Sequence, residues 1–279
     1  SRFLIAVMLL AAFQWAVAED ASHSDSRDGS SAVTGSWAAL GGLVGDWNGL
    51  VNAIAGLPDG SLVMGGDFSV CGDLALNHVA IYHPDTDSWS ALGAGTNGRV
   101  LAVGVLGNEI YVGGEFQQAG SVVARSVARW DGSAWHSLGV GDNNGVTGRV
   151  QAIGFAHGLV YVGGTFVRAG TTDAAQIVGW DGSQWVPLHS GNVNPNGSVR
   201  SILVSGNDVY VAGKEFRVDE VIGIVRWDGA AWHSLGEDGG SFYIRQVDAM
   251  AMYGGELYVA ANYAHPAGRM GQVSRWDGV

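Results

Sequence analysis

Residues 100–139 read VLAVGVLGNE IYVGGEFQQA GSVVARSVAR WDGSAWHSLG, and this stretch decides the fold because the chain repeats it. The tryptophan that opens each closing Trp-x-x-Leu segment marks the period: Trp89, Trp135, Trp185 and Trp232. By subtraction these residues are 46, 50 and 47 positions apart, and Trp37 opens an earlier segment. A period of this length indicates one supersecondary unit per repeat, which must stack on its neighbours to form a continuous core.

The pattern inside each repeat predicts antiparallel strands. An apolar run, residues 100–106, is followed by the turn Gly107-Asn108 and by a second run, residues 109–116. A third strand is expected at 126–130 and a fourth at 134–138, joined at Asp131-Gly132, a pair typical of type I′ hairpins. Four strands per repeat, a to d in chain order, predict one blade of an all-β β-propeller with four-stranded antiparallel blades.

The ends of the repeat region predict how the ring closes. The repeats begin near residues 51, 100, 150, 199 and 247, within a propeller domain at 36–279. An isolated d strand, Ser36 to Gly41, precedes the first repeat, and the last repeat stops at Trp276 to Val279, before its own d strand. We therefore expect five blades, with the N-terminal strand completing the last blade. The alternative is that the sequence belongs to a longer ring.

The first 35 residues differ from the repeats. Residues 1–18 combine Arg2, an uncharged apolar run and the ending Ala16-Val17-Ala18, which predicts a secretory signal peptide. Residues 19–35 are rich in Ser and Asp, and we expect a disordered linker there. The mature protein is accordingly expected to be secreted, periplasmic or at the cell surface, to lack a transmembrane segment and to be a monomer.

Composition narrows the choice of partners. The chain has 45 glycines in 279 residues, well above the usual share of about 7%, as a turn-rich β-protein requires. The formal net charge is −12, which argues against nucleic acid and against anionic membranes as partners. One cysteine, Cys71, excludes an internal disulfide. No metal or other cofactor is predicted.

The first repeat carries a family resemblance. It has Gly65-Gly66 followed by Tyr82-His83-Pro84-Asp85-Thr86-Asp87-Ser88-Trp89, which resembles a kelch motif, whereas later repeats use Arg-Trp-Asp-Gly-x-x-Trp. The region from Trp37 to the end is therefore similar to the kelch and galactose-oxidase-central-domain group of propellers. That resemblance implies a propeller fold. Most members of the group are interaction scaffolds and a minority are enzymes such as copper-radical oxidases, so fold alone does not decide the function.

Residues that recur in register are interpreted as structural. Nine of the 11 tryptophans occupy repeat positions, and His136 and His233 share the Trp-His-Ser-Leu slot without a second metal ligand at suitable spacing. Cys71 occupies the place of Ala119 and Ala169, so we expect a buried apolar residue there instead of a catalytic thiol.

The departures from the repeat predict the site. The d-to-a and b-to-c loops of a propeller emerge on one face, around the mouth of the central channel, and loops on a rigid scaffold commonly form binding sites. The candidate ligand-binding residues on this face are Trp47, Arg99, Arg149, Arg200, Phe242, Tyr243 and Arg245. The b-to-c segment of the fourth repeat, Lys214 to Glu220, departs from the repeat pattern. The alternative is that these are ordinary solvated loop residues.

The middle position of the inner-strand pattern Val-x-Ala/Ser also varies, as Asn52, Leu101, Gln151, Arg200 and Asp248. We expect these side chains to line the floor of the site, although Arg200 and Asp248 could instead form a structural ion pair. The sequence thus favours a secreted non-catalytic propeller that binds a protein or glycan ligand. The alternative is a secreted oxidase or carbohydrate-active enzyme with its site at the channel mouth, which requires converging His, Tyr or carboxylate groups.

Overall fold

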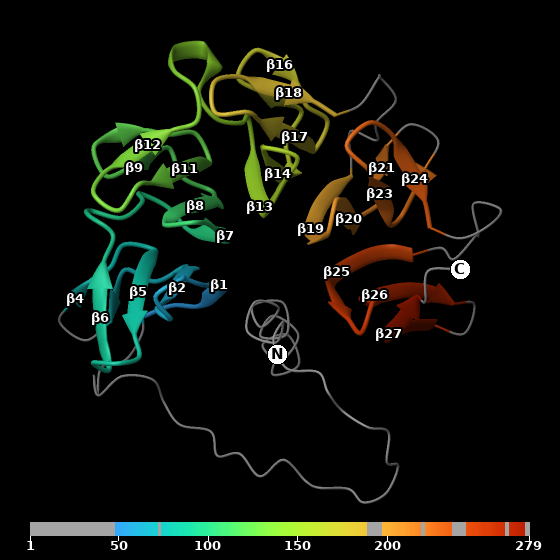
Figure 1. Cartoon of the computed structure of the whole chain (residues 1–279), viewed down its shortest axis with the longest axis horizontal. Coiled ribbons are helices and arrows are strands. Elements are labelled where there is room, and N and C mark those ends of the chain that lie inside the picture. The colour runs from blue at the N-terminus through green and yellow to red at the C-terminus, as the bar shows by residue number, and fades with distance from the viewer. Residues whose placement is uncertain are drawn as a thin grey trace, which may run out of the picture.

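The computed structural model of the chain describes residues 48–71, 74–188, 197–218, 221–235, 244–265 and 268–276. These residues form strands and turns, with one short 3-10 helix among them, η1 (Gly141–Asn143). The sheets follow one another around a centre, and the first strand of each sheet is innermost (Figure 1). The prediction of an all-β fold built from four-stranded antiparallel sheets is confirmed.

The strands of each blade pair in chain order. Blade 1 consists of β1 (Val51–Gly56), β2 (Leu62–Gly66), β5 (Val79–His83) and β6 (Ser88–Ala91). Blade 2 consists of β7 (Val100–Leu106), β8 (Glu109–Gly114), β11 (Val127–Trp130) and β12 (Trp135–Ser137). Blade 3 consists of β13 (Arg149–Ala156), β14 (Leu159–Thr165), β17 (Ile177–Trp180) and β18 (Trp185–Pro187). Blade 4 consists of β19 (Ser198–Ser205), β20 (Asp208–Lys214), β23 (Val225–Trp227) and β24 (Trp232–Ser234).

The remaining strands form a fifth unit and four small ribbons. Blade 5 has three described strands, β25 (Ile244–Tyr253), β26 (Glu256–His265) and β27 (Gly268–Trp276), and the pair Lys214–Gln246 joins it to blade 4. Two-stranded ribbons lie in the b-to-c connections of blades 1 to 4: β3 (Val70–Cys71) with β4 (Leu74–Ala75), β9 (Gln118–Ala119) with β10 (Val122–Val123), β15 (Arg168–Ala169) with β16 (Thr172–Asp173), and β21 (Arg217–Val218) with β22 (Val221–Ile222).

The repeated Gly-Gly doublet exists because neighbouring blades approach closely at this point. A β-carbon on Gly113 would lie 2.2 Å from Cγ1 of Val150, the fully buried valine that opens the next inner strand. Gly163 faces Val199 in the same way, at 2.4 Å. The glycine and the valine of the following repeat thus form one contact in blades 1 to 3, whereas blade 4 has Ala212 at the glycine position, in one cluster with Val247.

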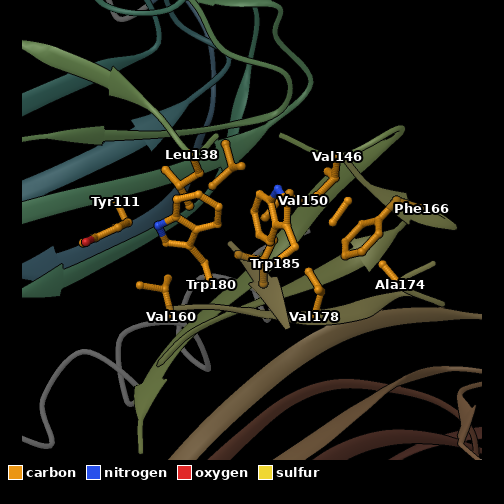
Figure 2. Packing of buried hydrophobic residues seen from close by; sticks show 13 residues of the cluster. Tyr111, Leu138, Val146, Val150, Val160, Phe166, Ala174, Val178, Trp180 and Trp185 are labelled. Carbon is orange, nitrogen blue, oxygen red and sulfur yellow. The ribbon is translucent and has the colours of Figure 1, made fainter. Parts of the chain in front are cut away.

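The repeated tryptophans join each blade to the one before it. Trp135 Nε1 donates to the carbonyl oxygen of Leu92, and Trp185 Nε1 to that of Asn143, each at 3.0 Å. Figure 2 shows Trp180 and Trp185 in the middle of a cluster that blade 3 shares with Tyr111 and Leu138 of blade 2. The interpretation of the repeat tryptophans as core or packing residues is confirmed for those described: Trp135, Trp180 and Trp185 are buried. The partly buried ones pack against the core clusters: Trp89, Trp130, Trp227, Trp232 and Trp276.

The turns between strands c and d differ from the prediction. Asp131-Gly132 is not a type I′ turn, because only Gly132 has a positive φ, at 98°. Four residues, Asp131 to Ala134, separate the strands, and Asp131 Oδ1 accepts hydrogen bonds from the backbone N–H groups of Ser133 and Ala134, each at 2.8 Å. The aspartate side chain therefore stabilises a wider loop by satisfying these N–H groups.

Blade 4 follows the repeat more closely than its sequence suggests. Glu215, whose φ is 48°, is a one-residue insertion, after which Phe216 takes the same buried position as Phe116 and Phe166. The ribbon β21–β22 follows as in the other blades. The described part of this segment, Lys214 to Val218, thus keeps the strand arrangement of the repeat although its sequence departs from the repeat pattern.

The predicted completion of blade 5 falls outside the described residues, since Ser36 to Gly41 are not among them. Residues 1–18 and 19–35, the expected signal peptide and linker, also lie outside. Within the described part of the chain, no helix is long and apolar enough to cross a membrane.

Candidate functional site

The loop face is held rigid by side chains of the d-to-a loops. Asn97 Oδ1 accepts hydrogen bonds from the backbone N–H groups of Gln117 and Gln118, at 2.8 and 2.9 Å. In blade 1, Asn48 binds the equivalent N–H groups of Ser69 and Val70. The d-to-a and b-to-c loops therefore contact each other on one face, as predicted. Arg99 lies two residues after Asn97, directly before β7.

Two of the predicted site residues, Arg99 and Arg149, share one carboxylate on this face. Arg99 binds Oε2 of Glu115 through Nε at 2.7 Å and Nη2 at 2.6 Å. Arg149, from the next blade, binds Oε1 of Glu115 at 2.9 Å. The arginine side chains are 43% and 50% exposed, and the trio carries one net positive charge in a chain of net charge −12.

The varying position of each inner strand coincides with a β-bulge. The strand register shifts between Val100 and Ala102 and again between Val150 and Ala152, and the same shift occurs in the other three inner strands. A bulged residue leaves the ladder, and the bulge redirects side chains locally. The variable residues are therefore the ones that the sheet does not constrain: Asn52, Leu101, Gln151, Arg200 and Asp248.

Several of these bulge residues form contacts between blades. Asn52 Nδ2 donates to the carbonyl oxygen of Val100, at 2.9 Å. Arg200 Nη1 forms an ion pair with Asp248 Oδ1 at 3.0 Å, and Gln246 Nε2 donates to the same oxygen at 2.6 Å. The alternative interpretation of Arg200 and Asp248 as an ion pair is therefore confirmed. Arg200 Nε is buried and has no acceptor among the described residues, so this arginine retains one unsatisfied donor.

The structure does not describe the side chains of the other predicted site residues. Trp47, Phe242 and Tyr243 are not among the described residues. Arg245 lies in β25, and its side chain is not described. The structure therefore brings together Arg99 and Arg149 through Glu115, and it places Arg200 in the next blade, on β19.

Residues interpreted as structural are found in structural roles. Cys71 is 1% exposed, packs with Phe68, Leu76 and Ala80, and burial raises the pKa of its thiol. His136 and His233 each bind the aspartate of their own c-to-d turn, at 2.6 Å. No group of three or more His, Cys, Asp or Glu side chains suited to a metal ion occurs among the residues that the structure describes.

A cavity at the opposite end of the blades was not predicted. It has a volume of about 350 Å³ and lies where the a-to-b turn of blade 3 meets blade 2, with walls that include Tyr111, Phe155, Leu159, Trp180 and Asp181. The sequence contained a signal for it, because Phe155, which lines the cavity, takes the inner-strand position of Val105 in blade 2 and Val204 in blade 4. The prediction had considered only the loop face.

Comparison with family models gives a match over residues 101–256, more than half of the chain, to the Rax2 C-terminal beta propeller domain. The chain belongs to the Rax2 C-terminal β-propeller family. The propeller fold is thereby shown, whereas a kelch or galactose-oxidase type is not. No curated protein matches the chain.

Solved structures resemble the Rax2-type propeller in fold alone. The extracellular domain of a putative one-component system from B. thetaiotaomicron matches with a TM-score of 0.51 and 14% identity, covering 81% of this chain and 27% of that one. The WD40 repeats of RRP9 match with a TM-score of 0.50 and 10% identity, covering 84% and 65%. The chain thus spans about a quarter of the length of the first structure and just under two thirds of the second.

Proposed function

We propose that this propeller is a non-catalytic binding module that recognises a protein or glycan ligand through its loop face. The observation that carries the proposal is the trio Arg99, Glu115 and Arg149, in which two half-exposed guanidinium groups share one carboxylate. A guanidinium has five N–H donors in a planar fork, so each arginine keeps donors for a ligand.

The chemistry of the trio favours an anionic or hydroxyl-rich ligand. A ligand carboxylate could bind two N–H groups of one guanidinium side by side, as carboxylates do with arginine. Uronic or other acidic sugars and acidic peptide side chains present such groups. The trio is also locally positive on an acidic protein, which would attract an anion to this face.

Rigidity of the loops supports the proposal. Asn48 and Asn97 fix the loops that deliver the inner strands, so little conformational entropy remains to be lost on binding. Location outside the cell, either secreted or surface-bound, fits the apolar leader predicted at residues 1–18. Trp47, Phe242, Tyr243 and Arg245 are proposed to complete the rim, with Trp47 supplying a stacking surface for a sugar ring.

The test is an array of acidic and neutral glycans and acidic peptides, probed with the intact chain and with matched variants. Arg149→Ala and Trp47→Ala should each weaken binding to the strongest hit by at least about 1 kcal/mol. Arg275→Ala is the matched control, because the Arg275 side chain is 56% exposed, close to the 50% of Arg149, and forms an ion pair with Glu256 at the other end of blade 5. Binding that survives the first two changes, or that falls equally in the control, would contradict the proposal.

A further inference from the structure

The charged side chains of blades 2 and 3 are divided unequally between the two ends of these blades. Both blades and the loops that lead into them lie within residues 92–188, all of which the structure describes. The turn end has three acids and one arginine: Glu109, Asp131, Asp181 and Arg129. The loop end has four arginines and three acids: Arg99, Arg125, Arg149, Arg168, Glu115, Asp142 and Asp173. The positive charge of this acidic chain is therefore gathered at the loop end.

One arginine of the loop end, Arg125, has no acidic partner among the residues that the structure describes. Arg99 and Arg149 bind Glu115, and Arg168 binds Asp173. Arg125 lies in the b-to-c connection of blade 2 and is exposed. A guanidinium is charged at any physiological pH, so Arg125 presents its full charge and its donors to the solvent.

Backbone hydrogen bonds place Arg125 beside the acid of the trio. Ser126, the residue after Arg125, accepts a hydrogen bond from the N–H of Gly114 and donates its own N–H to the carbonyl oxygen of Phe116, each at 2.9 Å. Glu115 lies between Gly114 and Phe116 in the chain. The segment that carries Arg125 therefore runs alongside the residue that Arg99 and Arg149 share.

Arg125 also packs against the loop that leads to Arg149. The Ser126 hydroxyl donates to the carbonyl oxygen of Gly148, the residue directly before Arg149. In the same loop Gly145 has a φ of 61°, and a β-carbon on it would lie 2.1 Å from the carbonyl oxygen and 2.8 Å from Cβ of Arg125. Glycine is required there because the loop passes so close to this arginine.

Three arginines and one acid thus meet at the boundary between blades 2 and 3, and we call them the arginine cluster: Arg99, Glu115, Arg125 and Arg149. By subtraction the cluster carries two net positive charges, one more than the trio alone. Its arginines come from three separate segments, which are the starts of β7 and β13 and the end of the b-to-c connection of blade 2. The remaining acid of the intervening loop, Asp142, lies in η1, which contacts the β15–β16 ribbon of blade 3.

Uncharged polar side chains border the arginine cluster. Gln117 and Gln118 are exposed, and Asn97 fixes their backbone N–H groups. The carbonyl oxygen of Gln117 accepts a hydrogen bond from the N–H of Ala124, the residue before Arg125, at 2.9 Å. A side-chain amide both donates and accepts hydrogen bonds, so two of them beside the cluster suit the hydroxyl groups of a sugar.

We propose that the arginine cluster binds a phosphorylated sugar, with the phosphate monoester at the three guanidinium groups and the sugar hydroxyls at Gln117 and Gln118. The inference rests on the proposed function and names the class of its ligand. A phosphate monoester carries about −1.5 to −2 charges at pH 7, which matches the net charge of the cluster better than the single charge of a carboxylate. Its tetrahedral oxygens also accept hydrogen bonds from several directions, as arginines from three segments require.

The test compares three ligands that share one sugar ring and differ in their acidic group: glucose-6-phosphate, glucose-6-sulfate and glucuronate. Each is titrated into the intact isotope-labelled chain and followed by NMR shifts. The backbone signals of 115–118, 125–126 and 148–149 should move. Glucose-6-phosphate should bind at least about fivefold more tightly than either singly charged sugar, since only it carries the second charge that Arg125 can meet.

Variants separate Arg125 from the rest of the cluster. Arg125→Ala should weaken binding of glucose-6-phosphate at least about fivefold and change binding of glucuronate less than about twofold. Arg149→Ala should weaken binding of both sugars. Arg168→Ala is the matched control, because this arginine side chain is 56% exposed, lies in the b-to-c connection of the next blade and pairs with Asp173. It removes the same charge from the protein and should leave the affinity for both sugars within about twofold.

Four results would overturn the proposal. If glucuronate bound as tightly as glucose-6-phosphate and Arg149→Ala weakened both, the loop face would bind anions as proposed above, but the ligand would not be a phosphate ester. Equal losses in Arg125→Ala and Arg168→Ala would show a general effect of charge. Tighter binding of a capped phosphoserine peptide, or equally tight binding of inorganic phosphate, would exclude recognition of the sugar. If no anion moved the signals of the cluster, the proposed function itself would be wrong.

Discussion

Blades 2 and 3 have the same interior and differ at their ends. In both, the first glycine of the doublet receives the valine of the next inner strand, and the strand-d tryptophan donates to the preceding blade. At the turn end, however, the ion pair Glu109–Arg129 of blade 2 is replaced by Leu159 and Gly179 in blade 3. The contacts made by the doublet glycine and the strand-d tryptophan are therefore constant in these two blades, while the positions at the turn end have diverged.

The loop face shows the same division. Asn97 of blade 2 is replaced by Thr147 in blade 3, and each still binds the b-to-c segment of its own blade. The acid after the doublet, Glu115, has become Thr165, so Arg149 forms its ion pair with the acid of blade 2 instead. Loss of a single acid in blade 3 thus produces the excess positive charge at the boundary between these blades.

Removing a tryptophan that joins two blades should have the largest effect. Trp135→Ala and Trp185→Ala should each lower the free energy of unfolding by about 3–5 kcal/mol, because each leaves a cavity and removes the hydrogen bond that the indole N–H donates to the preceding blade. Chemical denaturation measures the change. If the tryptophan makes equivalent contacts in blades 2 and 3, the two losses of unfolding free energy should agree within about 1 kcal/mol. A much smaller loss for Trp185→Ala than for Trp135→Ala would show that the contacts are not equivalent.

A methyl group on the doublet glycine should have the next largest effect. Gly113→Ala and Gly163→Ala should each cost about 1–3 kcal/mol, because the new β-carbon overlaps the valine of the next blade. Gly56→Ala is the control, since a β-carbon there would meet no atom within 4 Å and its φ is ordinary. Its unfolding free energy should change by less than about 0.5 kcal/mol. If Gly56→Ala lowered the free energy of unfolding as much as Gly113→Ala or Gly163→Ala, the steric explanation would be wrong.

Much of this architecture was predictable from the sequence, because contacts that recur from blade to blade require the same residue types at the same positions of each repeat. The run at 100–106 and the turn at Gly107-Asn108 correspond to β7 and the hairpin that follows it. The c-to-d loop at Asp131 was assigned to the wrong turn type, since side-chain hydrogen bonds determine its width and a residue pair does not encode them. The cavity was missed because its walls come from two repeats, Leu106 and Tyr111 from one and Phe155 and Trp180 from the next.

The smallest expected effect concerns the tyrosine beside the ion pair of blade 2. Burial, followed by the neighbouring Glu109, raises the pKa of Tyr111 to about 12. A raised tyrosine pKa contributes stability that is complete below the ordinary value of about 10 and is lost as pH rises through about 12. Glu109→Leu, which makes blade 2 resemble blade 3, should lower this pKa yet leave it above 10, because burial is the larger cause. Ultraviolet titration with Tyr111→Phe as reference measures it, and an unchanged pKa would exclude a role for Glu109.

The central claim, that the loop face binds an anionic ligand through Arg99 and Arg149, is tested most directly by changing the carboxylate they share. Glu115→Gln removes the negative charge that both guanidinium groups bind, so that both groups are available to an anionic ligand. Arg149→Ala removes one of the two guanidinium groups. Binding of the same acidic glycan or peptide, measured by calorimetry, should therefore become tighter in Glu115→Gln and weaker in Arg149→Ala. Changes in the same direction for both variants, or no change in either, would show that the trio only holds the two blades together.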